Sequence, residues 1–199
     1  MQKNVLLKSS LIAVLTLSLM LIPALEAEAL TEEEDTSFYA EALYTDVDDL
    51  DSDIGFLVGG EYEAREKFSV AGEYMRVTGE DDGPFTDDLD YRLHGFRVKG
   101  LMDITDEFAP DREELDVNLH GSLGYYDLEL ENGDDDSESD LGFTLGAGFN
   151  YELEDDVELR GNLGYRFVDF DDLEDPNSGT EDDVDADGYE ISVGLGITL

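Results

Sequence analysis

The last ten residues of the chain, "EISVGLGITL" (190–199), alternate between apolar residues and small or polar ones. The apolar positions are Ile191, Val193, Leu195, Ile197 and Leu199. A period of two places such residues on one face of a β-strand. The ends of soluble domains are usually frayed and polar. An amphipathic strand in this place therefore predicts that the end of the chain pairs with another strand.

Seven earlier runs show the same period of two, which gives eight predicted strands in all. They are 37–45, 54–62, 68–77, 92–102, 115–128, 141–151 and 157–167. Eight strands in one small domain predict a sandwich or a barrel. In the fourth run, Tyr91 and Leu93 are out of phase with Phe96 and Val98, which predicts a β-bulge near His94.

The linkers between these runs alternate in length and charge. Those after odd-numbered strands are long and acidic, whereas those after even-numbered strands are mostly shorter. The long ones are 46–53, 79–90, 131–140 and 169–188, and the others are 63–67, 103–114 and 152–156. This alternation predicts an up-and-down antiparallel meander with two unlike ends, which a Greek-key sandwich does not explain. The final strand would close the meander by pairing with the first strand.

The two faces of the predicted strands differ in an informative way. One face is apolar, and the other carries Gly, Ser, Thr, Asn and single charges. The interior of an eight-stranded barrel is just wide enough for side chains to fill, so small residues suit it. An apolar exterior is required in a bilayer, and strands of about 9 to 11 residues can span one. The sequence therefore predicts an eight-stranded antiparallel up-and-down transmembrane β-barrel. Aromatic girdles are expected at Tyr44, Tyr62, Tyr74, Tyr125, Tyr151, Phe167 and Tyr189.

The N-terminal segment has the pattern of a secretory signal peptide. Lys3 and Lys8 precede the apolar run 11–22, and the small-x-small triplet 27–29 follows. The apolar run is shorter than the about 20 residues that a spanning helix needs. We expect cleavage after Ala29, which leaves 1–29 as the signal peptide and 30–199 as the barrel domain.

The charge is extreme, with a formal net value of −42 and no cysteine. Nucleic acid is excluded as a direct partner by such an acidic surface. The four long linkers hold 27 acidic residues and no basic one. This composition predicts loops that attract cations, or a protein from a halophilic bacterium, where salt screens the repulsion.

The predicted hairpin "IGFLVGGEYEAREKFSVAGEYMRV" (54–77) resembles the second and third strands of the OmpA-like eight-stranded barrels, the porin-family outer membrane β-barrel proteins. The shared motifs are Gly60-Glu61-Tyr62 and Gly72-Glu73-Tyr74. The stretch "LHGSLGYYDLEL" (119–130) is similar to the family's fifth strand. The resemblance implies a bacterial outer membrane protein that contacts lipids and is inserted by the barrel-assembly machinery through its C-terminal strand. It also implies a structural or surface role, or at most a narrow ion pore. The family usually ends on an aromatic residue, and Leu199 departs from that pattern.

Charged residues on the predicted inward face form the first candidate site. They are Glu41, Glu61, Glu73, Arg97, Lys99, Glu158, Arg160, Arg166 and Glu190. Buried charges are retained only when they are paired. We interpret them as a structural polar plug rather than as a gate on a water path, because eight strands leave little lumen.

Two weaker motifs suggest other chemistry. His120 and Ser122 share a strand face, as a lipid A deacylase-like enzyme would require, but they are expected to point inward. The stretch "DVDADG" (183–188) offers Asp183, Asp185 and Asp187 as a calcium loop, but Gly194 replaces the bidentate Glu. We therefore expect no enzyme and no cofactor. A soluble lipocalin-like binder is a further alternative, and it requires the two strand faces to be reversed.

Overall fold

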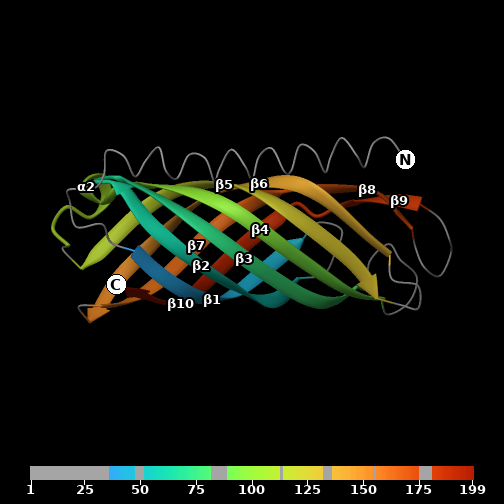
Figure 1. The fold of residues 1–199 in the computed structure, drawn as a ribbon, viewed down its shortest axis with the longest axis horizontal. Helices are drawn as coiled ribbons and strands as arrows, with labels where there is room; N and C mark the ends of the chain where they lie inside the picture. Colours follow the sequence, from blue (N-terminus) through green and yellow to red (C-terminus); the bar gives the residue numbers. More distant parts are fainter. Residues whose placement is uncertain are drawn as a thin grey trace. The chain divides into compact units, whose positions relative to one another are not determined.

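The computed structural model describes residues 36–47, 52–81, 89–112, 114–131, 136–154, 156–174 and 181–199. The predicted signal peptide lies outside these residues. Eight strands form a closed antiparallel barrel in the order β1-β10-β7-β6-β5-β4-β3-β2 (Figure 1). They are β1 (Thr36–Val47), β2 (Asp53–Arg65), β3 (Phe68–Asp81), β4 (Leu89–Asp103), β5 (Leu115–Glu131), β6 (Asp136–Glu154), β7 (Val157–Phe167) and β10 (Gly188–Thr198). The predicted fold is thus confirmed.

The strand at the C-terminus closes the barrel, as predicted. β10 pairs with β1 from Ser37↔Thr198 to Val47↔Gly188, and its other edge pairs with β7. Closure leaves no strand edge, so no barrel strand offers unpaired backbone groups to a hydrocarbon environment.

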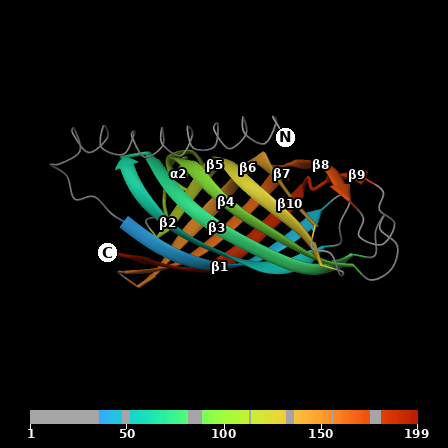
Figure 2. The same cartoon turned by 45° about the vertical axis from the view of Figure 1, so that its right-hand side comes forward.

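Side chains alternate between the lumen and the outside of the barrel. Large apolar residues face outward, and Ile54 and Leu123 are each 71% exposed. Figure 2 shows the tilted strands that form the wall of the barrel. This arrangement contradicts the lipocalin-like alternative, which needed the apolar face inside.

Several strands are longer than predicted. β6 has 19 residues and continues through part of the predicted linker 131–140. At about 3.3 Å per residue such a strand is roughly 60 Å long, which exceeds the about 25 Å apolar band even when it is tilted. The ladder continues because pairing in the barrel extends the register outward, and this overrides the low β-propensity of Asp and Gly.

The two barrel ends differ in the connections that they carry. The end with the turns after β2, β4 and β6 is called here the short-turn end, and it carries α2 (Thr105–Phe108). The other is the long-loop end, where β8 (Asp169–Glu174) pairs with β9 (Glu181–Asp185). Figure 1 shows α2 and the β8–β9 hairpin at opposite ends. The segment 169–188, expected to be a plain linker, thus contains a hairpin. In the described residues, no helix is long and apolar enough to cross a membrane.

The predicted bulge near His94 was wrong. The β3–β4 register runs without a shift from Phe68↔Met102 to Asp81↔Leu89. Tyr91 and Leu93 share the inward phase of Arg97 and are almost fully buried. The phase seemed to change because the interior is apolar at this level. Register shifts occur instead beside the short turns, at Glu63/Arg65 and Glu152/Glu154.

An apolar cluster fills the interior at the long-loop end. Barrel strands contribute inward residues that include Leu43, Leu57, Met75, Leu93 and Leu128. The segment of the β8–β9 hairpin contributes Val168, Phe170, Val184 and Ala186, all at most 2% exposed. The hairpin therefore covers the end of the barrel by burying its own apolar side chains. The inward apolar residues at this end, together with Val168, Phe170, Val184 and Ala186 of the hairpin segment, are called here the apolar cap.

Candidate functional site

The nine predicted interior charges all lie on the inward phase of their strands. Seven of these residues are buried: Glu41, Glu73, Arg97, Lys99, Arg160, Arg166 and Glu190. The remaining two, Glu61 and Glu158, have intermediate exposure and lie nearer to the short-turn end. We call the set the charged layer.

Arg97 lies at the centre of one group of contacts. Its Nε donates to Glu73, and its Nη1 donates to Glu190 Oε2 at 2.6 Å. Strands β4 and β10 are four positions apart in the eight-stranded barrel, so the Arg97–Glu190 pair crosses the lumen. This pair therefore blocks the lumen rather than lining its wall.

Two further cations complete this group. Arg166 Nη1 donates to Glu190 Oε1 at 2.8 Å, and its Nε donates to the carbonyl of Ala186 at 3.2 Å. Lys99 Nζ lies 3.2 Å from Glu73 Oε1. The bond to Ala186 joins the charged layer to the segment that carries the apolar cap.

Arg160 organises a second group toward the short-turn end. Its Nη2 donates to Glu61 at 2.5 Å, and its Nη1 donates to Glu158 at 2.7 Å. Its Nε lies 3.6 Å from Glu41, which is an ion-pair distance without a hydrogen bond. Glu41 is held mainly by other partners, Asn162 at 3.0 Å and Ser192.

Tyr39, Asn162 and Ser192 were not predicted as part of this site. Tyr39 donates to Glu73 at 2.7 Å, and its ring lies 4.0 Å from the Arg160 guanidinium carbon. Asn162 accepts from Lys99 at 3.2 Å and so bridges the two groups. The alternation of residues along each strand predicts that these three side chains point inward. It does not predict which carboxylates they contact.

One glycine has a clear steric role in the charged layer. A Cβ atom on Gly59 would lie 2.6 Å from the Tyr39 hydroxyl, which is closer than real Cβ contacts allow. Gly59 therefore leaves the space through which Tyr39 reaches Glu73. This fits the expectation that glycine on the inward face lets larger side chains pass one another.

The charged layer is close to electrically neutral. It combines five carboxylates with four cations, in a chain whose net charge is −42. Each buried carboxylate has at least one cation or hydrogen-bond donor, which offsets much of the desolvation cost of burying it. The arrangement can hold the barrel walls together and obstruct the lumen.

His120 and Ser122 lie inside the barrel, 8% and 6% exposed. Among the described residues, neither His120 Nδ1 nor Ser122 Oγ has a hydrogen-bond partner, so no bond joins the two. A Ser nucleophile requires a neighbouring base and an accessible substrate. This geometry gives the deacylase-like alternative no support.

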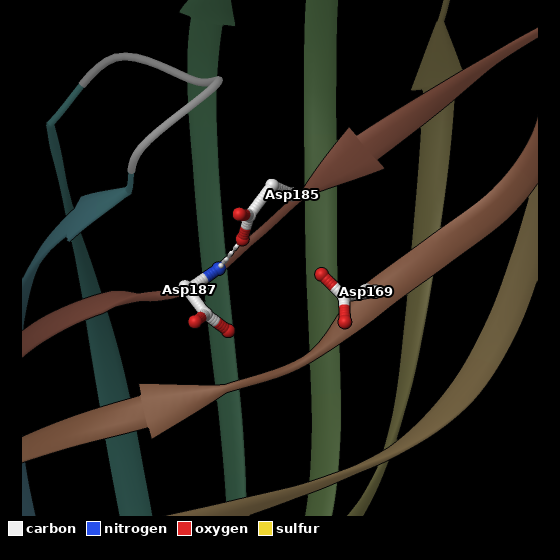
Figure 3. Close-up of side chains that lie close together, drawn as sticks. All are labelled: Asp169, Asp185 and Asp187. Carbon is white, nitrogen blue, oxygen red and sulfur yellow. Dashed lines mark hydrogen bonds between the residues drawn. The ribbon is translucent and has the colours of Figure 1, made fainter.

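The structure brings two members of the predicted calcium triplet together, and the side chain of the third, Asp183, lies outside the described residues. Asp185 and Asp187 gather with Asp169, and one carboxylate oxygen of each lies within 4.8 Å of the others (Figure 3). Asp169 joins because it pairs with Asp185 in the β8–β9 ladder. Asp187 Oδ1 accepts from the Val168 amide at 2.7 Å, and Asp185 Oδ1 accepts from the Asp187 amide at 2.9 Å. Asp183 falls within β9.

Aromatic side chains gather on the outward face of the barrel. Tyr165 and Tyr189 have ring centroids 4.9 Å apart, and Phe143 and Phe167 lie 4.5 Å apart. Tyr189 is 57% exposed. Exposed rings at the strand ends suit the interface between lipid and water.

Three comparisons place this geometry among known proteins. Residues 17–196 match the family model described as the outer membrane protein beta-barrel domain. No curated protein sequence matches significantly.

Solved structures of outer membrane proteins share the fold. Neisserial surface protein A is 16% identical to this chain, with a TM-score of 0.59. The match covers 83% of this chain and 97% of the Neisserial protein. OprG from Pseudomonas aeruginosa is 15% identical with a TM-score of 0.61, covering 84% and 97%. A major outer membrane protein from Thermus thermophilus is 14% identical with a TM-score of 0.59, covering 84% and 100%. The family match, the closed barrel and the apolar exterior agree: the chain belongs to the outer membrane protein beta-barrel domain family and is a bacterial outer membrane protein.

Proposed function

We propose that this protein has a non-enzymatic, structural or surface role in the outer membrane, with an interior that conducts ions narrowly or not at all. The observation that carries the proposal is the double obstruction of the lumen. The charged layer crosses it through the Arg97–Glu190 pair, and the apolar cap closes the long-loop end around Phe170.

The two obstructions act differently on an ion. The charged layer has near-zero net charge and strong internal pairing, so a passing ion must replace an existing salt bridge. The side chains that the hairpin segment contributes to the apolar cap, Val168, Phe170, Val184 and Ala186, offer no polar group to replace the hydration shell of an ion. An open pore would require the cap to move as well as the ion pairs to break.

The surface role rests on the long-loop end. In outer membrane barrels the long loops are extracellular and the short turns are periplasmic. The long-loop end would therefore present the acidic linkers, including the Asp169, Asp185 and Asp187 group, to the medium. We expect diffuse binding of cations there, and insertion by the barrel-assembly machinery through β10.

Planar bilayer recordings test the proposal. The wild-type protein is expected to give no large, stable openings, and at most small and brief events. Porin-sized, long-lived openings of the wild type would overturn the sealed interior. Arg97→Ala should raise the frequency of small events because it removes the pair that crosses the lumen. Arg92→Ala is the matched control, since Arg92 pairs with Glu129 at 2.8 Å and is not among the interior charges.

A further inference from the structure

The exterior of the barrel changes from apolar to charged across three neighbouring strands, β3, β4 and β5. One outward-facing row of their ladders is aromatic and holds Tyr74, Phe96 and Tyr125. The next outward row toward the long-loop end is polar and holds Arg76, His94 and Asp127. On the outside of an outer membrane barrel, aromatic residues mark the level where lipid tails give way to headgroups. The polar row therefore lies at the level of the headgroups.

A shallow pocket lies across the boundary between the two rows. Its volume is about 610 Å³, which is within the range for small-ligand sites. It is lined by Tyr74, His94, Phe96, Tyr125, Asp127 and Glu129. The rings of Tyr74 and Phe96 have centroids 4.8 Å apart, and the Tyr74 hydroxyl lies 2.8 Å from His94 Nδ1. These contacts hold the aromatic part of the lining in place.

Opposite charges stand at the two ends of the polar row. Two strand spacings put the backbones of Arg76 and Asp127 about 10 Å apart. Within the described part of the chain, no carboxylate pairs with the Arg76 guanidinium. Asp127 accepts a hydrogen bond from the Ser139 hydroxyl at 2.6 Å, but no described cation pairs with it. Both charges are therefore available to a ligand on the outside of the barrel.

The arrangement of these charges distinguishes between kinds of ligand. A purely anionic group at Arg76 would be repelled by the carboxylates on β5, and a purely cationic group at Asp127 would leave Arg76 unpaired. The planar guanidinium of Arg suits two oxygens of a phosphate. A carboxylate beside an aromatic ring, as Asp127 is beside Tyr125, suits an ammonium group. The row therefore matches a zwitterion in which a short carbon link joins a phosphate to a primary ammonium.

The apolar surface beside the pocket fits the acyl chains of a lipid. The next outward row toward the short-turn end holds Gly72, Val98 and Leu123. Val98 and Leu123 are exposed, and a Cβ atom on Gly72 would have no other heavy atom within 4 Å. An acyl chain attached to the phosphate has room to lie against this surface. A soluble headgroup would gain nothing from it.

We infer that this exterior site binds a lipid with a phosphoethanolamine headgroup, with the phosphate on Arg76, the ammonium on Asp127 and the acyl chains over Gly72 and Val98. Glu129 contributes less, because Arg92 already donates to it at 2.8 Å. The inference goes beyond the proposed function. It needs only the position of the barrel in the membrane and does not depend on whether the barrel conducts ions.

Native mass spectrometry of the intact protein, released from detergent micelles with added lipid, tests this site. Dioleoyl phosphatidylethanolamine carries both charges, whereas dioleoyl phosphatidylglycerol carries the phosphate without the ammonium. The wild type should retain the ethanolamine lipid about tenfold more tightly, the effect of one charge-assisted hydrogen bond. Asp127→Asn should abolish this preference, because it removes the partner of the ammonium. Arg76→Gln should weaken the retention of both lipids, because it removes the partner of the phosphate.

The matched control is Asp46→Asn, which removes an exposed charge from the outside of β1 and should keep the preference. Heat-modifiable gel mobility shows whether each variant is folded. Soluble phosphoethanolamine distinguishes the source of the headgroup, and it should bind more weakly than the lipid. Equal binding of the soluble headgroup would overturn a lipid as the occupant. Equal retention of the two lipids by the wild type, or equal effects of Asp127→Asn and Asp46→Asn, would overturn the zwitterionic site.

A measurement on the wild-type protein needs no variant to fold. The chain has two histidines. His94 lines the site, and His120 lies inside the barrel. Changing the nanodisc lipid from phosphatidylglycerol to phosphatidylethanolamine should shift the NMR signals of the His94 ring and leave those of His120 in place. An unmoved His94 signal would overturn the inference.

Discussion

The two halves of the barrel interior have the same strand phase but opposite chemistry. Toward the long-loop end, the inward positions hold apolar residues such as Leu93 and Phe170. In the middle, inward positions on β4 and β10 hold Arg97 and Glu190. The difference teaches that the inward positions of a small barrel can be filled with either a hydrophobic core or a network of ion pairs. This barrel uses both, in different regions of its interior.

The apolar cap and the charged layer are stabilised by different physical interactions. The apolar cap is stabilised by burial of hydrocarbon surface, and its loss can be local, since the β8–β9 hairpin is a peripheral element. The charged layer is stabilised only while every charge keeps its partner, because an unpaired buried charge costs several kcal/mol. Variants in each half should therefore fail in different ways.

The largest effect is expected from Arg97→Ala in the charged layer. The change leaves Glu190 with Arg166 alone and weakens the neutralisation of Glu73. The free energy of unfolding should fall by about 3–5 kcal/mol, the usual cost of breaking one partner from a buried pair. Urea unfolding in lipid, followed by heat-modifiable gel mobility, measures the change.

The control for this experiment is Arg92→Ala. Arg92 and Glu129 have side chains 26% and 35% exposed, and such surface pairs contribute at most about 1 kcal/mol. If both variants unfold at the wild-type urea concentration, the charged layer is hydrated and does not behave as a buried network.

A somewhat smaller and more local effect is expected from Phe170→Ala in the apolar cap. Phe170 is fully buried, and removing a buried ring costs about 3 kcal/mol or more when the cavity does not collapse. Because the hairpin can open without the barrel, most of the loss should appear as faster amide exchange in β8 and β9. Phe108→Ala, at a residue 73% exposed on α2, is the control. Equal exchange in all three proteins would mean that the ring does not anchor the hairpin.

The third prediction contrasts the acidic long-loop end with the interior. Like charges on the loops repel across about 30 Å at 0.01 M salt but only about 3 Å at 1 M. A protease site placed between Glu174 and Glu181 should therefore be cut faster at low NaCl, whereas the unfolding midpoint of the barrel changes little. Calcium should protect the site at lower concentrations than NaCl.

The Asp169→Asn variant sharpens this third test. If calcium protection saturates at micromolar concentration and is lost in this variant, the group of Asp169, Asp185 and Asp187 is a specific site. If the variant behaves like Asp46→Asn, which removes an exposed charge on β1, the binding is diffuse. Salt-independent cleavage, with the protease itself controlled for salt, would contradict charge repulsion altogether.

The smallest effect concerns the exposed pair Lys67–Asp106, at 2.7 Å on the short-turn end. The hydrogen bond and charge of Lys67 lower the pKa of Asp106, and Asp106 in turn raises the pKa of Lys67. The pair is therefore intact at neutral pH. It is lost as the pH falls through the lowered pKa of Asp106, or rises through the raised pKa of Lys67.

An NMR titration of the Asp106 carboxyl checks this pair. In Lys67→Met the pKa of Asp106 should rise toward its ordinary value, while the unfolding midpoint stays unchanged because water screens exposed charges. An Asp106 titration that is identical in both proteins would show that the pair does not form in solution.

The sequence by itself determined the number of barrel strands, their order and the inward phase of all nine residues of the charged layer. It did so because a strand that has lipid on one side must alternate with a period of two. It also identified the closing strand, since an amphipathic end needs a partner. It did not distinguish strand from linker in acidic segments such as 136–140, where the ladder continues beyond the apolar band.

Only the tertiary structure decided which charge meets which. Arg97 and Glu190 are 93 residues apart and lie on opposite walls of the barrel. Asp169 joins Asp185 and Asp187 because the hairpin folds back on itself. A period of two states whether a side chain points into the lumen, but not its height or its partner across the lumen. Those depend on the closure and stagger of the whole barrel, and no single strand contains them.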